Sequence, residues 1–253
     1  MNRVSVVVPT YNEAENISSL VKQIDDALRG IAYEVIFVDD SVDNTPEVIE
    51  AVMRENPNVR IRHRAGETGL ATAVLEGFQM AEGDCIAVMD ADLQHPPKLL
   101  RSMVCCLESG ADICVPSRFI PGGSDGGLGP YRKLVSGVAR YTGKILLPVL
   151  RRISDPTSGL FMFRREVISG ANLQPIGWKI LTEVLATGTY RTVIEIPYQF
   201  QPRPAGESKF TFRATMAYLK QLAGLMKRGK KQRRIRVIRW SDERMKAAEE
   251  VSF

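Results

Sequence analysis

Residues 85–94 read Cys-Ile-Ala-Val-Met-Asp-Ala-Asp-Leu-Gln, an apolar run that ends in two carboxylates two positions apart. Gly83 precedes the run and Pro96-Pro97 follows it, which is typical of a buried parallel strand that leads into a helix. Side chains two residues apart on a strand point to the same side. Open α/β sheets bind ligands at the carboxyl ends of their strands. Since Mg²⁺ prefers one or two carboxylates plus substrate phosphates, Asp90 and Asp92 predict a metal–diphosphate site. The alternative is a solvated turn whose acidic residues cap the next helix.

Strand and helix patterns alternate on both sides of this run. Strands are expected at 4–9, 33–38, 59–62, 112–116, 160–163 and 192–198, and helices at 13–28, from 45, at 69–81, 96–107, 131–150, 180–186 and 211–226. This order predicts an α/β fold with a doubly wound, mainly parallel, Rossmann-like sheet. Neither G-x-G-x-x-G after the first strand nor a P-loop motif occurs, which disfavours dinucleotide-binding and P-loop enzymes.

Composition is that of a compact globular protein. The chain of 253 residues, with 44% hydrophobic and 25% charged residues, is long enough for one large α/β domain. Its four cysteines lack C-x-x-C spacing, which favours reduced thiols in a cytosolic setting. With only two histidines, the sequence disfavours a zinc centre of the usual ligand spacing.

Charge and hydropathy give expectations about membranes. The N-terminus has no signal-peptide pattern, and no apolar stretch of about 18 residues predicts a transmembrane helix. The formal net charge is +5, but residues 227–239 hold eight lysines and arginines and no acidic residue. We therefore assign the basicity to a C-terminal tail and not to the folded domain.

Four motifs follow one another in register: Val-Pro-Thr-Tyr-Asn-Glu at 8–13, Val-Asp-Asp-Ser at 38–41, Asp-Ala-Asp-Leu-Gln-His-Pro-Pro at 90–97 and Asp-Pro-Thr-Ser-Gly at 155–159. Together they resemble family 2 glycosyltransferases of the GT-A fold. With Ser-Arg-Phe at 117–119 and the segment 203–209, the resemblance is nearest to dolichol-phosphate (polyprenyl-phosphate) mannose synthases. It covers about residues 3–215.

The resemblance implies roles for particular residues. The nucleotide sugar is expected to contact Pro9, Tyr11, Glu13, Val38, Asp40, Asp90, Ala91, Asp92 and Arg118. The metal, Mg²⁺ or Mn²⁺, is expected on Asp90, Asp92 and Gln94, whereas Asp39 is expected to be a structural turn carboxylate. Catalysis is assigned to Asp92, Arg118, Arg203 and Lys209. Arg118, Arg203 and Lys209 are also expected to bind an acceptor phosphate. We add Arg132 as a fourth phosphate ligand; a solvated arginine at the start of a helix is the alternative.

Domain organisation follows from the same reading. Residues 1–210 are expected to form the catalytic domain, with a nucleotide-binding half (1–120) and an acceptor-binding half (121–210). Residues 211–253 are expected to form an amphipathic helix and a basic tail. The apolar segments 144–151 and 217–226, together with the basic run, predict peripheral attachment to the cytoplasmic face of a membrane. The alternative is that both segments pack on the core.

The function expected is metal-dependent, inverting transfer of a hexose, mannose from GDP-mannose being favoured, to a polyprenyl (dolichyl) phosphate. A phosphate acceptor is already anionic at neutral pH and needs no general base. One alternative is a polyprenyl-phosphate glucosyltransferase that uses UDP-glucose. Another is a family 2 transferase acting on a saccharide hydroxyl, for which Glu183 is the nearest base candidate, although a helix-surface position is favoured for it. Nucleic-acid binding through the basic run is a minor alternative and is not expected, because the run lacks aromatic interleaving before Trp240.

Overall fold

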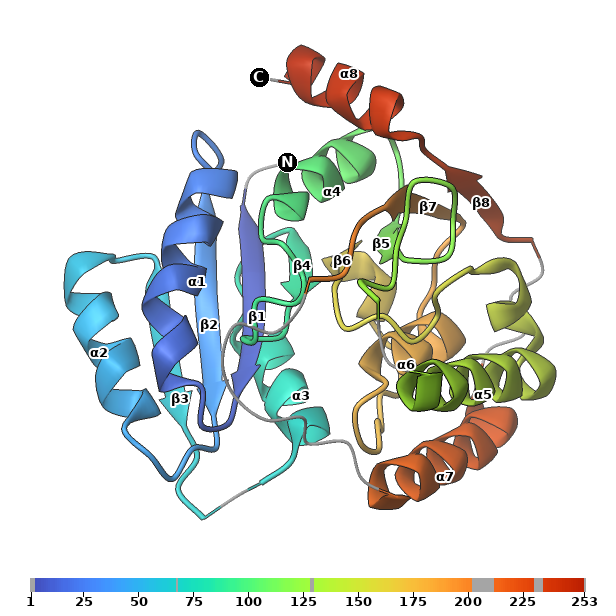
Figure 1. Ribbon diagram of the computed structural model, residues 1–253, viewed down its shortest axis with the longest axis horizontal. Coiled ribbons are helices and arrows are strands. Elements are labelled where there is room, and N and C mark those ends of the chain that lie inside the picture. The colour runs from blue at the N-terminus through green and yellow to red at the C-terminus, as the bar shows by residue number, and fades with distance from the viewer. Residues whose placement is uncertain (1–2, 67, 128–129, 202–211, 230–233, 253) are drawn as a thin grey trace.

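A computed structural model describes residues 3–66, 68–127, 130–201, 212–229 and 234–252. They form a single eight-stranded sheet in the order β3-β2-β1-β4-β6-β5-β7-β8, covered by helices on both faces (Figure 1). The strands are β1 (Val4–Thr10), β2 (Tyr33–Asp39), β3 (Val59–His63), β4 (Cys85–Val88), β5 (Ile113–Ser117), β6 (Phe161–Arg164), β7 (Thr192–Pro197) and β8 (Arg236–Arg239). All neighbours pair in parallel except β6, which runs antiparallel between β4 and β5. The expected α/β, mainly parallel sheet is therefore confirmed.

The helices are α1 (Ala14–Ala27), α2 (Thr45–Glu55), α3 (Leu70–Met80), α4 (Leu99–Glu108), α5 (Pro130–Leu146), α6 (Ile180–Thr187), α7 (Phe212–Arg228) and α8 (Asp242–Ser252), with 3₁₀ turns at Pro148–Arg152 and Arg165–Ile168. The helix expected over 131–150 ends earlier, at Leu146. Pro148 explains this, since proline has no N–H to continue a helix and disfavours helical backbone in the residue before it.

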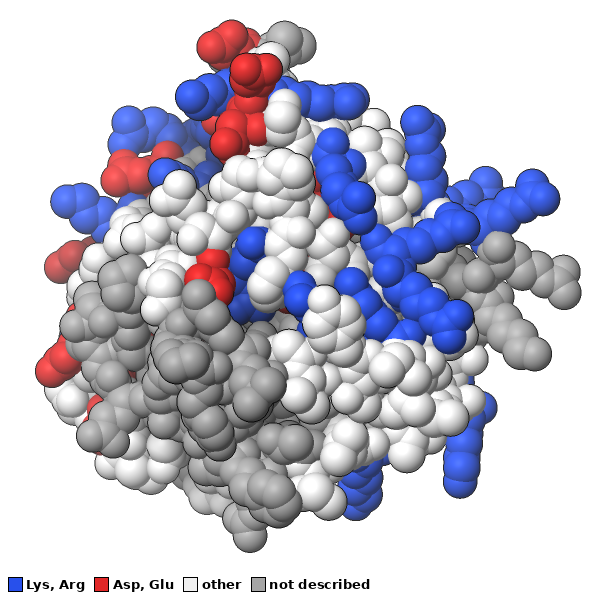
Figure 2. Space-filling view, turned by 45° about the vertical axis from the view of Figure 1, so that its right-hand side comes forward, with Lys and Arg blue, Asp and Glu red and all other residues white. Residues whose placement is uncertain are grey.

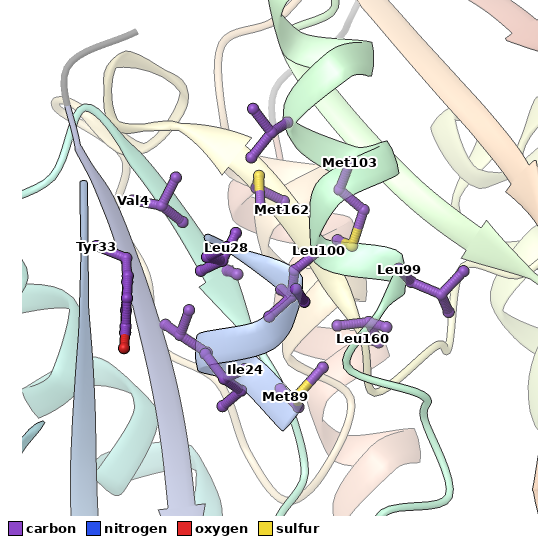
Figure 3. Packing of buried hydrophobic residues seen from close by; sticks show 14 of the residues in the cluster. Val4, Ile24, Leu28, Tyr33, Met89, Leu99, Leu100, Met103, Leu160 and Met162 are labelled. Atoms are coloured by element: carbon purple, nitrogen blue, oxygen red, sulfur yellow. The ribbon is translucent and has the colours of Figure 1, made fainter. Parts of the chain in front are cut away.

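Alternation along the strands builds two cores, one on each side of the sheet. Val4, Val6 and Val8 of β1 join the cluster formed with α1 and α4, whereas Val7 joins the opposite cluster with α3 and α6. Figure 3 shows part of the first cluster, which includes Ile24 of α1, Leu28 directly after α1, and Leu100 and Met103 of α4. Because both faces are covered, ligands reach the sheet from the carboxyl ends of its parallel strands.

The C-terminal region differs from the expected tail. Arg236 and Arg239 belong to β8, which pairs in parallel with β7. Trp240, directly after β8, is buried in the first cluster, and α8 packs against α4. Val237 and Ile238 supply the apolar surface of this strand, and the charges around them conceal that pattern in the sequence. Part of the basic run therefore belongs to the fold.

Candidate active site

The residues singled out from the sequence gather along one edge of the sheet. The carboxyl ends of β2, β1 and β4 lie side by side there, in that order. Because β6 is antiparallel, its start lies beside the end of β4, which brings the turn 155–159 to the same edge. The ends of β5 and β7 complete the row. The edge thus has a half around β1, β2 and β4, and a half around β5, β6 and β7.

Asp39 holds the first half together. This fully buried carboxylate accepts hydrogen bonds from Thr10 Oγ1 (2.7 Å) and Ser41 Oγ (2.6 Å). His63 Nδ1 lies 2.8 Å from its other oxygen. These contacts tie the ends of β1, β2 and β3 together, which supports the expected structural role of Asp39.

Asp40 lies beside it and is tightly held. The Arg64 guanidinium donates two parallel hydrogen bonds of 2.7 Å to its two oxygens, and the Gly69 N–H donates a third, of 2.8 Å. Both Asp40 and Arg64 are buried. This pair joins the end of β2 to the start of α3 and so fixes the backbone on this side of the site. A direct contact of Asp40 with a nucleotide stays a prediction.

The turn after β1 presents the most open of the expected nucleotide contacts. The Tyr11 side chain is 40% exposed, and the left-handed Asn12 (φ 55°) follows it. Asn12 N–H donates to Ser41 Oγ and Asn12 Oδ1 accepts from Val42 N–H, which ties this turn to the end of β2. Stacking of the exposed Tyr11 ring on a base stays a prediction.

The other expected contacts of that half are less exposed. Glu13 accepts a hydrogen bond from the Asn16 amide (2.8 Å) at the start of α1. Pro9 is half-buried in β1, and Ala91 is buried in the turn after β4. Val38 is fully buried in the second cluster, so its side chain serves core packing.

Asp90 and Asp92 follow β4 in a turn, not on the strand itself, which ends at Val88. Strand alternation therefore does not set their directions: Asp92 is buried and accepts the Gln94 N–H at 3.0 Å, whereas the Asp90 side chain is 37% exposed. The Gln94 amide donates to Gln201 O at 3.3 Å. Leu93, between Asp92 and Gln94, has a left-handed backbone (φ 57°), which bends this turn sharply.

Space beside Asp90 depends on Gly159. A Cβ at position 159 would lie 2.4 Å from Asp90 Oδ2 and 3.1 Å from His95 Nε2. In the described part of the chain no group of three His, Cys, Asp or Glu side chains is arranged to hold a metal. Two carboxylates, one of them open to solvent, fit a divalent cation whose remaining ligands are phosphate oxygens and water. The residues present therefore suit the expected metal–diphosphate.

His95 is a neighbour whose place the sequence did not indicate. Its buried ring stacks on Tyr198 and meets Phe200 edge to face, and Nε2 lies 3.9 Å from Asp90 Oδ2. Burial lowers the pKa of His95 to about 4, and the Asp92 carboxylate only partly opposes this. The imidazole is therefore neutral at physiological pH, and it places an uncharged aromatic ring beside Asp90.

Arg118, at the end of β5, is held by Asp155. Arg118 Nε donates to Asp155 Oδ2 at 2.8 Å and Nη2 donates to Oδ1 at 3.2 Å, which is a bidentate pair. Burial disfavours the charged guanidinium, but the pKa of Arg118 is raised because Asp155 favours the cation. Among the residues that the structure describes, the hydrogen bonds of Arg118 use Nε and Nη2, and Nη1 carries two further N–H donors.

Lys179 is the second cation of this half, and sequence reasoning missed it. Its Nζ donates to Thr157 O at 3.4 Å, in the turn that holds Asp155. Burial lowers the pKa of Lys179, and Arg118 acts in the same direction, whereas Asp155 and Asp90 oppose it. Lys179 precedes α6 and is far in sequence from every motif, so no local pattern could have found it.

Glu195 of β7 holds the backbone that leads into the turn at 155–159. This fully buried carboxylate accepts from Ser154 N–H (2.6 Å) and Ser154 Oγ (2.8 Å), one residue before Asp155. Arg239 of β8 donates to it at 3.3 Å. A residue of the basic run thus helps to fix the turn that carries Asp155.

Glu183, considered above as a base candidate on a helix surface, is instead fully buried. It accepts hydrogen bonds from Gln174 N–H (2.7 Å), from Gln221 Nε2 (3.0 Å) and from Arg228. These contacts join α6 to α7. The helix-surface expectation was wrong, and the carboxylate has a structural role.

Three other residues assigned to the site cannot be placed. Arg203 and Lys209 lie outside the described residues, and Arg132 lies in the part of α5 whose side chains are not described. Their roles stay predictions.

Comparisons with known proteins agree with this arrangement. The model of the family described as Glycosyl transferase family 2 matches residues 5–170. A dolichol-phosphate mannosyltransferase of Pyrococcus furiosus is 45% identical over 226 residues; the match covers 89% of this chain but 64% of that protein, so the chain spans under two thirds of this relative. The dolichol-phosphate mannosyltransferase of Saccharomyces cerevisiae is 36% identical over 237 residues, covering 87% of this chain and 86% of that protein.

Among solved structures, glucosyl-3-phosphoglycerate synthase of Mycobacterium tuberculosis, in complex with Mn²⁺, UDP-glucose and phosphoglyceric acid, has a TM-score of 0.66 at 18% identity. The match covers 91% of this chain and 81% of that one. At this identity the likeness shows the fold alone, and it confirms the expected GT-A fold.

Proposed function

The chain belongs to glycosyl transferase family 2 and is a glycosyltransferase, and from this premise we propose that it transfers mannose from a nucleotide sugar to a polyprenyl phosphate. GDP-mannose is the proposed donor. The single observation that carries the proposal is the edge of the sheet, where a carboxylate pair suited to a metal–diphosphate lies next to a cationic half with Arg118 and Lys179. The names of the relatives, mannosyltransferases of dolichol phosphate, support the same acceptor and sugar.

The donor would bind in the half around β1, β2 and β4. Tyr11 would stack on the base, and Asp90 and Asp92 would hold the divalent cation together with the diphosphate. When bound, the cation would stabilise the negative charge that develops on the leaving nucleoside diphosphate. Inversion requires the acceptor to approach the sugar from the side opposite the leaving diphosphate. We expect this to be the side of Arg118.

A phosphate acceptor fits the second half better than a hydroxyl. Transfer to a hydroxyl normally uses a carboxylate or imidazole base. Here Asp155 is paired with Arg118, and Glu183 and Glu195 accept hydrogen bonds from backbone and side-chain donors. A phosphate monoester is already anionic at neutral pH and needs positioning by cations instead.

The test uses labelled GDP-mannose and labelled UDP-glucose in parallel, each with polyprenyl phosphate and Mg²⁺ or Mn²⁺. Label that partitions into the organic phase measures transfer to lipid. We expect transfer from GDP-mannose, its loss with chelator, and its loss in Asp92→Asn. Transfer from UDP-glucose alone would change the donor, and product only with a saccharide acceptor would refute the proposal.

We also propose that α5 and α7 attach the enzyme to a membrane surface. Val138, Tyr141 and Ile145 of α5 are 55%, 58% and 69% exposed and recur at helical spacing, as do the exposed Met216, Leu219 and Met226 of α7. The two helices pack side by side, so closely that a Cβ at Gly143 would lie 2.4 Å from the Tyr218 hydroxyl (Figure 1). Of the helices in the described ranges, none combines the length and apolar character needed to cross a bilayer.

Charge supports the same surface. Figure 2 shows Lys and Arg side chains gathered on the right-hand part of the face that it views, where Asp and Glu are few. Arg140, Lys144 and Arg239 lie close enough for their charges to interact, and Arg151 donates to Lys144 O. An apolar stripe flanked by cations is suited to anionic lipid headgroups.

Co-sedimentation with phosphatidylserine-containing vesicles tests this attachment. Ile145→Glu places a charge on the stripe and should weaken binding at least about tenfold, since burying an unpaired carboxylate in lipid is costly. Val42→Glu, at an exposed apolar position of the other half of the molecule, is the matched control. Equal sedimentation of both variants would contradict the proposal.

A further inference from the structure

Lys179 carries a role that no motif in the chain assigns. Gly177 has a left-handed backbone (φ 80°) and lies against Ala217 of α7, while the Lys179 carbonyl accepts a hydrogen bond from Gln221 of α7 at 3.3 Å. The backbone is thus fixed on both sides. It places Trp178 at the surface, 42% exposed, and the Lys179 ammonium against the turn at Thr157.

The surroundings of the ammonium are those of the reaction site. The charged groups that interact with it are Arg118 and Asp155 of the second half and Asp90 of the first half. Asp155 is already paired with Arg118, and Asp90 faces the proposed metal–diphosphate. Among the described residues, Thr157 O is the one acceptor that Nζ reaches, and an ammonium has three donors.

These observations point to an anion as the missing partner. The Lys179 side chain is half-buried, and a partly desolvated ammonium is stabilised when a negative group meets its remaining donors. Resting on the function proposed above, we propose that Lys179 binds the acceptor phosphate, together with Arg118, and positions it against the anomeric carbon of the donor. The Lys179 ammonium lowers the repulsion between the acceptor phosphate and the donor diphosphate, and the proton stays on Nζ throughout.

The position explains why a lysine serves here. Arg118 is fixed by a fork that fits one carboxylate, whereas an ammonium on a flexible stem can follow a phosphate from approach to attack. The attacking phosphate oxygen forms the new bond to the anomeric carbon while the bond from that carbon to the diphosphate breaks. The attacking oxygen loses its negative charge, the leaving diphosphate oxygen gains one, and no proton has to be removed.

The test measures binding and turnover separately. Lys179→Met keeps the stem and removes the charge, Lys179→Arg restores a cation, and Lys22→Met removes an exposed lysine of α1 as the control. Calorimetry with geranyl phosphate, in the presence of Mn²⁺ and GDP, should show affinity reduced by about ten- to a hundredfold in Lys179→Met, as expected for one charge-assisted hydrogen bond. GDP–Mn²⁺ affinity should stay within twofold, and melting temperatures report on folding.

In steady state, the KM for polyprenyl phosphate should rise and kcat should fall in Lys179→Met, with substantial recovery in Lys179→Arg. Equal binding of geranyl phosphate by the wild type and Lys179→Met, or a matching loss of GDP–Mn²⁺ affinity, would overturn the acceptor assignment. Absence of geranyl phosphate binding by the wild type would also overturn it. If the wild type makes no mannolipid yet binds geranyl phosphate through Lys179, the proposed function fails and the anion site stands.

Discussion

The substitution Gly159→Ala tests whether the position of the Asp90 carboxylate matters for activity. The added Cβ would lie 2.4 Å from Asp90 Oδ2, so the carboxylate must retreat by about 1 Å to reach ordinary contact. On the other side, His95 Nε2 would be 3.1 Å from the same Cβ, and the buried, stacked His95 ring has little freedom to move. Asp90 is partly exposed, so the change falls mainly on it.

A displacement of that size near reacting groups costs about 100-fold in rate, or about 2.7 kcal/mol of transition-state stabilisation. Because the Asp90 side chain can move toward solvent, the free energy of unfolding should change by less than about 1 kcal/mol. We therefore expect a folded enzyme with about 1% of the wild-type kcat/KM. The affinity for Mn²⁺ in the presence of GDP should also be weaker.

Organic-phase partition of labelled mannolipid measures kcat/KM, a Mn²⁺ titration by electron paramagnetic resonance measures the metal, and thermal melting measures folding. Gly137→Ala is the matched control, since nothing lies within 4 Å of its added Cβ. It should keep activity within about twofold and gain up to about 1 kcal/mol of helix stability. If Gly159→Ala keeps wild-type turnover and Mn²⁺ affinity, Asp90 does not hold the metal in the geometry described.

Three further changes test the charges of the interior. Glu183→Gln leaves Arg228 facing a neutral group and should lower the free energy of unfolding by about 3 kcal/mol; lost turnover at unchanged stability would instead mark a base. Burial alone would raise the pKa of Glu34, but Ser5, the Glu82 N–H, Arg3 and Arg60 lower it below the ordinary 4.5. Its stabilisation is thus present above pH 4.5 and lost as the pH falls through the lower pKa of the folded state, so Glu34→Gln should flatten the acid side of a stability-against-pH profile; an unchanged profile would exclude this. Arg118→Lys keeps the charge but loses the bidentate fork to Asp155, so transfer should fall at least about tenfold; full activity would mean that charge alone suffices.

The elements and the first half of the site could be predicted because their signals are local. Runs such as 4–8 and 33–38 alternate between two buried faces, and each run is bounded by turn residues. A parallel sheet then brings the ends of these strands together without further information, which is how Asp39, Asp40 and Asp90 come to lie along one edge.

The second half depends on long-range contacts that no spacing reveals. Lys179 meets Arg118 across 61 positions of sequence, because α6 packs under the turn at 155–159. Arg239 reaches Glu195 because β8 adds to the sheet edge. Likewise, Glu183 has the helical spacing of a surface residue until α7 covers it. Each case is a polar side chain whose partner comes from a distant element.

The distribution of these charges argues for the type of acceptor. Within the described ranges, the carboxylates buried in the second half are Asp155, Glu183 and Glu195, and each lies within hydrogen-bonding distance of an arginine. Their oxygens already accept hydrogen bonds within the protein, which leaves these carboxylates poorly placed to take a proton from a sugar hydroxyl. Arg118 Nη1 and Lys179 Nζ, in contrast, have donors that the hydrogen bonds among the described residues do not use up. In this half the carboxylates have structural contacts, and the cations are proposed to bind the ligand. Such a site suits a nucleophile that is already ionised, as a phosphate monoester is.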